Sequence, residues 1–159
     1  LFYTDKLYVI GAGHCGKALG KLACLCGFYV TLIDNRLEII DNLPADCFHR
    51  ALQHNYTNLA EIIDFSPDCW IVIMTQGHLN DKDVLEQCLR KPFRYLGMIG
   101  SKTKASATFA KLKEKGFTVE ELAKCHSPVG LPIGSNTPHE IAVSIMAELI
   151  SLRNLPDKE

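Results

Sequence analysis

The chain has 159 residues with 17 basic and 18 acidic side chains, and its net charge of -1 gives no electrostatic reason to expect nucleic acid or a membrane surface as a partner. Its hydrophobic content of 47% is that of an ordinary globular protein, and its apolar runs are too short to span a bilayer. The seven cysteines are dispersed without any Cys-x-x-Cys pair, which indicates reduced thiols in the cytoplasm rather than a disulfide framework or a zinc site.

Strand-like and helix-like segments alternate along the chain, which predicts a parallel sheet covered by helices on both faces. The expected strands cover residues 7–11, 29–34, 47–51, 70–75 and 95–99, and the expected helices cover residues 14–26, 57–64, 80–90 and 102–115. Right-handed crossovers then give the strand order 3-2-1-4-5 of a doubly wound, Rossmann-like α/β fold. We expect residues 1–159 to form a single domain of this kind.

Two later helices have explicit start signals. Thr118 and Glu121 fit a capping box, and Thr137 and Glu140 repeat the pattern with Pro138 at the first helical position. Apolar residues then recur at helical spacing at Ile141, Ala142, Ile145, Met146, Leu149 and Ile150. We interpret this stripe as core packing against the sheet, with a contact between two copies of the chain as the alternative.

A glycine-rich turn follows the first expected strand and opens the first helix. In the dinucleotide-binding fingerprint, Gly11 permits the tight turn, Gly13 lets the backbone approach a pyrophosphate, and Gly16 allows close packing of helix and strand. The anion would bind to free N–H groups at the start of the helix. Of the two unusual residues in this loop, we expect His14 to face the ligand and Cys15 to be a small apolar filler.

The second expected strand ends at Asp34, where an acidic side chain can accept a hydrogen bond from a ribose 2′-OH. Together with the glycine turn, this position predicts NAD(P) binding. Arg36 would favour a 2′-phosphate, so the choice between NAD and NADP stays open.

Two further loops come to the same edge, because ligands of an open parallel sheet bind beyond the carboxyl ends of its strands. After the fourth strand, Thr75, Gly77 and His78 are candidate ligand contacts. His78 is either a ligand contact or proton carrier, or simply hydrogen-bonded. Asp81 and Asp83 are expected to serve the positive end of the following helix.

After the fifth strand, Gly100, Ser101 and Lys102 offer a flexible backbone, a hydroxyl and an ammonium at a helix start. This combination predicts a second anion site, and the alternative is a solvated helix terminus with an incidental lysine. No arrangement of nucleophile and base can be recognised from the sequence, so we assign no catalytic residue.

Four stretches of the sequence resemble one family: Gly-Ala-Gly-His-x-Gly after the first strand, Thr-x-Gly-His-x-x-Asp after the fourth, Tyr-Leu-Gly-Met-Ile-Gly-Ser-Lys-x-Lys after the fifth, and the tail from His126 to Glu148. The chain is similar to the C-terminal Rossmann domain of the xanthine dehydrogenase accessory proteins, the XdhC/CoxI family. The resemblance covers residues 7–152.

This resemblance implies a maturation factor that binds the molybdenum cofactor, assists its sulfuration by a cysteine desulfurase, and delivers it to an apoenzyme of the xanthine dehydrogenase type. Full-length members of the family carry an N-terminal domain ahead of this one, which the chain lacks. We therefore expect either a fragment or a stand-alone Rossmann member.

Two other functions remain open from the sequence. One is an NAD(P)-dependent oxidoreductase whose substrate domain is a partner chain or a missing segment, and the other is a nucleotide-sensing regulatory domain. The segment after the fifth strand leaves no room for a substrate domain that would present an acid or base to a nicotinamide, so we do not expect hydride chemistry.

Overall fold

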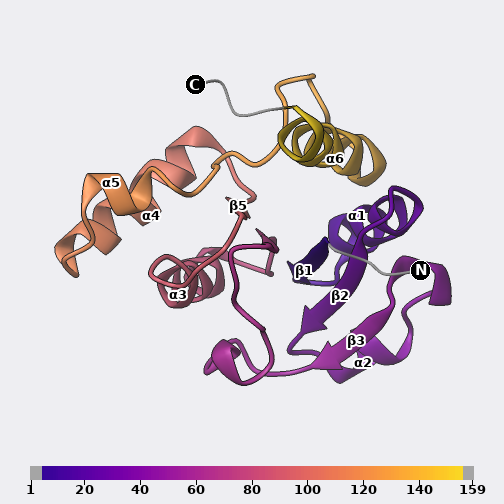
Figure 1. Ribbon diagram of the computed structural model, residues 1–159. Helices are drawn as coiled ribbons and strands as arrows, with labels where there is room; N and C mark the ends of the chain where they lie inside the picture. Colours follow the sequence, from indigo (N-terminus) through magenta and orange to yellow (C-terminus); the bar gives the residue numbers. More distant parts are fainter. Residues whose placement is uncertain (1–4, 156–159) are drawn as a thin grey trace.

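The computed structural model describes residues 5–155 and contains a five-stranded sheet between two layers of helices (Figure 1). The strands, all parallel, lie in the order β3-β2-β1-β4-β5 and comprise β1 (Lys6–Ile10), β2 (Tyr29–Asp34), β3 (Arg50–Gln53), β4 (Cys69–Ile73) and β5 (Tyr95–Met98). The α-helices are α1 (His14–Leu25), α2 (Leu37–Asp41), α3 (His78–Cys88), α4 (Lys102–Glu114), α5 (Val119–Leu122) and α6 (Pro138–Asn154). The predicted fold class and strand order are confirmed.

Alternate residues of the central strands enter different cores, as expected when helices cover both faces of a parallel sheet. In β1, Leu7 and Val9 pack in the core under α1 and α6, whereas Tyr8 and Ile10 pack in the core under α3, α4 and α5. Figure 1 shows α1 and α6 side by side on one face. The apolar stripe of α6 lies in the first of these cores, which confirms its interpretation as core packing.

Two local expectations need correction, and one short helix was not predicted. The strand expected at 47–51 begins later, at Arg50, because Pro44 precedes a 3-10 turn, η1 (Ala45–Cys47). The helix expected at 57–64 is only a 3-10 turn, η2 (Leu59–Glu61), because Asn58 adopts a left-handed conformation with φ 52° that cannot continue a helix. Helix α2 was not predicted, and none of its five residues is buried.

Both capping boxes are present. The Thr118 and Thr137 hydroxyls accept hydrogen bonds from the backbone N–H groups of Glu121 and Glu140, whose carboxylates bond back to the backbone N–H groups of the two threonines. The sequence therefore determined both helix starts locally.

The segment from His126 to Leu131 returns beside β5 and is fixed to α6 by a cluster around Glu148. The Glu148 carboxylate accepts hydrogen bonds from the Tyr95 hydroxyl at 2.6 Å and the Gly130 N–H at 2.8 Å, and it lies 3.4 Å from Nδ1 of His126. The His126 ring stacks on Tyr95. We call Tyr95, His126, Gly130 and Glu148 the Glu148 cluster.

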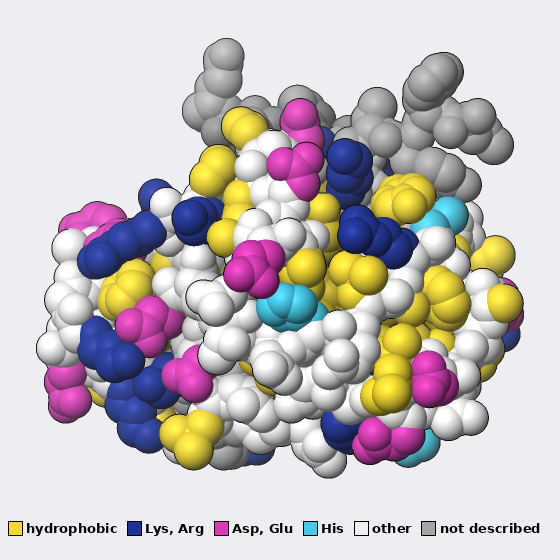
Figure 2. Space-filling model, turned by 90° about the horizontal axis from the view of Figure 1, so that it is seen from below, with side chains coloured by type: hydrophobic (Ala, Val, Ile, Leu, Met, Phe, Trp, Pro, Cys, Tyr) yellow, Lys and Arg dark blue, Asp and Glu magenta, His cyan; other side chains and the backbone are white. Residues whose placement is uncertain are grey.

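On the face shown in Figure 2, basic and acidic side chains are intermixed rather than gathered by sign. Within residues 5–155, no helix combines the length and the apolar character that crossing a membrane requires.

Candidate functional site

The glycine turn lies between β1 and α1, where two of its three glycines are required by the protein's own packing. A Cβ on Gly11 would lie 2.1 Å from the carbonyl oxygen of Met74, and Gly11 also has φ +113°. A Cβ on Gly16 would lie 2.0 Å from the carbonyl oxygen of Gly11. Any larger residue at either position would therefore displace backbone, as the fingerprint predicts for a tight turn and close helix packing.

Gly13 is different, because the surrounding protein leaves space beside it. A Cβ there would meet only one atom within 4 Å, the Nη2 of Arg36 at 4.0 Å. Its backbone angles, φ -69° and ψ -163°, are open to any residue. Gly13 is the N-cap of α1, yet no side chain caps the helix, so its first N–H groups are left without that partner.

Asp34 lies at the end of β2 and is fully buried. One carboxylate oxygen accepts hydrogen bonds from the Ala12 N–H at 2.8 Å and from Arg36 Nη2 at 3.0 Å. The other accepts from the Arg36 N–H at 3.0 Å and from Arg36 Nε at 2.9 Å. Asp34 thus fixes the glycine turn and holds the Arg36 guanidinium by a bidentate pair, an arrangement in which its oxygens are occupied.

The interaction between Asp34 and Arg36 favours the ionised carboxylate and the protonated guanidinium. Burial would raise the pKa of Asp34, but the hydrogen bonds from Arg36 and Ala12 outweigh it and keep the pKa below its usual value. The hydrogen bond to Asp34 raises the pKa of Arg36 in turn. The accessible group at the end of β2 is therefore a guanidinium rather than a carboxylate.

At the end of β4, Thr75 is held by Asp81 from the first turn of α3. The Asp81 carboxylate accepts hydrogen bonds from the Thr75 N–H at 2.9 Å and from the Thr75 hydroxyl. Asp81 thus lies in the first turn of α3, as expected, and its carboxylate holds the turn that precedes the helix. Gly77 is the N-cap of α3 with φ +99°, and α3 begins at His78, whose side chain lies outside the described part of the structure.

At the end of β5, Ser101 is the N-cap of α4, and its hydroxyl accepts a hydrogen bond from the Lys104 N–H at 3.2 Å. Gly100 has φ +134°, and Lys102 is exposed at the first position of the helix. The Ser101 hydroxyl oxygen thus acts as the acceptor that caps α4, whereas an anion would be bound by the O–H donor of the same group.

A cavity of about 460 Å³ lies over the glycine turn, and we call it the glycine-loop cavity. It is lined by Ala12, Gly13, His14, Cys15, Gly16, Lys17, Arg36, Ile39, Met74, Thr75, Gln76 and Ile99. Its charged lining consists of cations only, Lys17 and Arg36, with no carboxylate among its lining residues. This environment is suited to an anionic ligand.

The cavity brings together only part of the predicted site. Gly13, His14, Gly16, Arg36 and Thr75 line it, whereas the side chain of Asp34 is covered by Arg36. From the loop after β5, only Ile99 lines the cavity. Gly11, Gly77, Gly100, Ser101 and Lys102 are not among its lining residues, and the predicted side chain of His78 lies outside the described part of the structure.

Sequence reasoning missed Lys17, Gln76 and Ile39 as lining residues. Lys17 could have been predicted from the sequence, because a residue directly after the third glycine lies in the first turn of the helix, near the expected anion. Ile39 had none, since it comes from the unpredicted helix α2.

Two kinds of chemistry find no support in the residues of this edge. Burial raises the pKa of the Cys15 thiol, which disfavours the nucleophilic thiolate. Within residues 5–155, no three or more His, Cys, Asp or Glu side chains gather closely enough to hold a metal ion.

Comparisons with known proteins point to one family. The family described as the XdhC Rossmann domain matches residues 7–149. The chain is 33% identical to the uncharacterized protein YqeB of Escherichia coli over 94% of its length, and 31% identical to a Bacillus subtilis protein described as a probable subunit of xanthine dehydrogenase over 93%. It is also 38% identical, over 52% of its length, to the molybdenum cofactor insertion chaperone PaoD of Escherichia coli.

Among solved structures, a Bacillus halodurans protein described as a xanthine dehydrogenase superposes on 96% of this chain with a TM-score of 0.82 and 29% identity. The chain spans less than half of these longer proteins, from 26% of PaoD to 44% of the Bacillus halodurans chain.

Proposed function

The chain belongs to the XdhC family, and we propose that it serves as an accessory factor that binds the molybdenum cofactor as cargo for an apoenzyme of the xanthine dehydrogenase type. The relatives support this proposal by their descriptions, one as a probable subunit of xanthine dehydrogenase and one as a molybdenum cofactor insertion chaperone. The cofactor would bind in the glycine-loop cavity.

The observation that carries the proposal is the space beside Gly13. Packing within the chain does not require a glycine there, whereas it does at Gly11 and Gly16. The missing side chain lets a ligand approach the backbone at the uncapped start of α1, where free N–H groups can bind a phosphate. The pterin of the molybdenum cofactor ends in such a phosphate.

The Asp34–Arg36 pair supports a ligand with a phosphate rather than a plain ribose diol. A 2′-OH would need a carboxylate acceptor, but Asp34 is fully buried and bonded to Arg36. The guanidinium instead provides donors for a second anionic group.

The accessible Arg36 guanidinium also favours a second candidate function, a nucleotide-binding module for NADP in a regulatory or redox role. NADP also carries a phosphate at the ribose, where Arg36 would be its partner. NAD lacks that phosphate, and Asp34, the carboxylate at the end of β2, is already bonded to Arg36.

Sulfuration of the cofactor, in this proposal, depends on a partner. The cysteine in the cavity, Cys15, has a thiol pKa raised by burial, so it is a poor sulfur carrier. We propose that a cysteine desulfurase supplies the sulfur while this chain holds the cofactor.

The test is a titration of wild type and Gly13→Ala with molybdenum cofactor, NADP and NAD. A methyl group at Gly13 should weaken binding of the true ligand at least about tenfold, because a charge-assisted phosphate contact of roughly 1.5–3 kcal/mol is lost. We expect the molybdenum cofactor to bind most tightly.

Lys113→Ala, at the last turn of α4, is the matched control and should leave every affinity unchanged. Tight binding of NADP without cofactor binding would establish the second candidate. Equal affinities of wild type and Gly13→Ala for all three ligands would refute a site at the glycine turn.

A further inference from the structure

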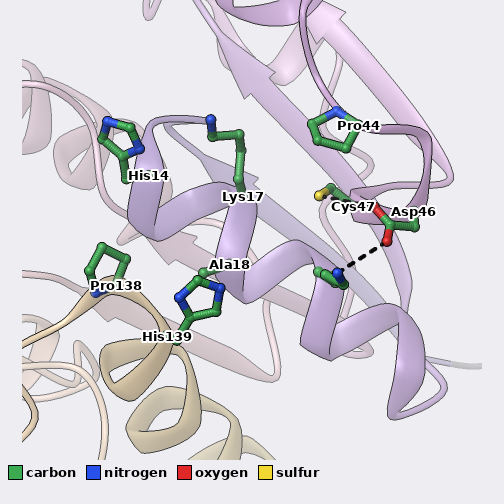
Figure 3. A pocket seen from close by; sticks show the side chains of 9 residues that line it. His14, Lys17, Ala18, Pro44, Asp46, Cys47, Pro138 and His139 are labelled. Atoms are coloured by element: carbon green, nitrogen blue, oxygen red, sulfur yellow. Dashed lines mark hydrogen bonds and ion pairs between the residues drawn. The ribbon is translucent and has the colours of Figure 1, made fainter.

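A second cavity of about 440 Å³ lies on the outer side of α1 and is distinct from the glycine-loop cavity. It is lined by His14, Lys17, Ala18, Lys21, Pro44, Asp46, Cys47, Pro138 and His139, which come from α1, from the turn at η1 and from the start of α6 (Figure 3). We call it the α1 groove. His14 and Lys17 also line the glycine-loop cavity, so the two cavities adjoin across the first turn of α1.

The groove results from close packing of the turn at η1 against α1. A Cβ on Gly20 would lie 2.3 Å from the carbonyl oxygen of Cys47, so only a glycine lets this turn approach the helix. One face of α1 then forms the floor, because His14, Lys17, Ala18 and Lys21 are spaced three or four residues apart.

Nitrogen-bearing side chains dominate the lining. Lys17, Lys21, His14 and His139 can all donate hydrogen bonds, and the single carboxylate is that of Asp46. Lys21 is 3.3 Å from Asp46, but this pair is more than half exposed, so a ligand can replace it at little cost.

Lys17, which also lines the glycine-loop cavity, gives a second indication. It is only partly exposed, yet among residues 5–155 no carboxylate lies within ion-pair distance of it. A half-buried ammonium without a counter-ion is favoured when an anion binds beside it.

The two imidazoles lie toward the α6 side of the groove. Figure 3 shows His14, Pro138 and His139 on one side of α1, while Asp46 and Cys47 lie on the opposite side. Pro44 and Pro138 have no backbone N–H and add rigid apolar walls for the organic part of a ligand.

We propose that the α1 groove binds a small organic phosphate, with Lys17 and Lys21 on its floor as cations and His14 and His139 as hydrogen-bond donors toward α6. This site goes beyond the proposed function and does not depend on it. The two cavities share His14 and Lys17, but they can be separated by mutation of the residues that they do not share. Lys21 and His139 line only the groove, whereas Gly13 lines only the glycine-loop cavity.

The test uses ¹⁵N-labelled protein titrated with inorganic pyrophosphate and followed by backbone amide NMR. In wild type, we expect saturable shifts at Ala18, Lys21, Cys47 and His139. The double variant Lys21→Ala/His139→Ala should weaken the affinity reported by Ala18 and Cys47 about tenfold, since two partly exposed charge-assisted contacts are removed. Lys113→Ala should not change it.

Gly13→Ala separates the two sites. The shifts at Ala18 and Cys47 should persist in this variant with unchanged affinity, even where the glycine turn no longer responds. Shifts confined to the glycine turn in wild type, or equal affinities of wild type and the double variant, would overturn the proposal. Lys21→Ala/His139→Ala removes only exposed side-chain atoms, and Gly13→Ala adds a methyl group in open space, so the unperturbed remainder of the spectrum checks the fold.

Discussion

The glycine-loop cavity and the Glu148 cluster contain similar groups, glycines and a buried carboxylate, but use them differently. In the Glu148 cluster the protein fills the space that a glycine leaves: a Cβ on Gly130 would lie 2.3 Å from the Ser144 hydroxyl oxygen, and Glu148 is bonded on both oxygens. Beside Gly13 the space stays open, and the nearby helix start has no cap. Because the protein itself does not need a glycine at this position, we place the proposed ligand site beside Gly13.

The largest expected effect tests this distinction inside the glycine turn. Gly16→Ala should lower the free energy of unfolding by about 4 kcal/mol, because its Cβ would overlap the Gly11 carbonyl oxygen. Gly13→Ala should stay within about 1 kcal/mol of wild type, since the small loss of a glycine N-cap is offset by a less flexible unfolded chain. Urea denaturation of both variants measures the difference, and similar losses in both would mean that Gly13 is also a packing glycine.

Glu148→Ala should lower the free energy of unfolding by about 3 kcal/mol, because the buried Tyr95 hydroxyl and the Gly130 N–H lose their acceptor. Ligand affinity of the folded variant should not change. The exposed Glu114→Ala serves as control and should fall within about 0.5 kcal/mol of wild type. A loss of ligand affinity without a loss of unfolding free energy would mean that Glu148 contributes to binding rather than to the fold.

The Glu148 cluster also predicts a pH dependence of stability. Burial would raise the pKa of Glu148, but its hydrogen bonds from His126, Tyr95 and Gly130 outweigh that effect and lower it. The resulting stabilisation is present above the unfolded pKa of about 4.3 and is lost as the pH falls through the lower folded pKa. The stability advantage of wild type over Glu148→Gln, of about 1 kcal/mol, should thus shrink as the pH falls below about 4. An advantage that stays unchanged through this acidic range would contradict this account.

The smallest expected effect concerns the loop after β5. Lys102 is exposed and does not line the glycine-loop cavity, so it acts on a bound anion only through a screened charge. Lys102→Ala should weaken anion binding about twofold, and this change should disappear at high salt. A tenfold loss that persists in salt would show that Gly100, Ser101 and Lys102 form a direct anion site, as the sequence first predicts.

Much of the fold could be predicted from local sequence. The alternation of strands and helices gave the strand order, and the two capping boxes placed the starts of α5 and α6 because those bonds join residues three apart. The errors, at β3 and at the 3-10 turn near Leu59, occurred where one residue's backbone conformation decides the outcome.

The candidate site divides in the same way. The glycine turn could be recognised from the sequence itself, since the spacing of its three glycines lies within one short stretch of chain, and the demand on Gly16 comes from Gly11 in the same stretch. Only the tertiary structure decided that Arg36 covers Asp34, that Gly13 faces open space, and that His139 from α6 lies beside α1. These features depend on distances between side chains far apart in the chain, which packing of the whole fold sets and no local pattern encodes.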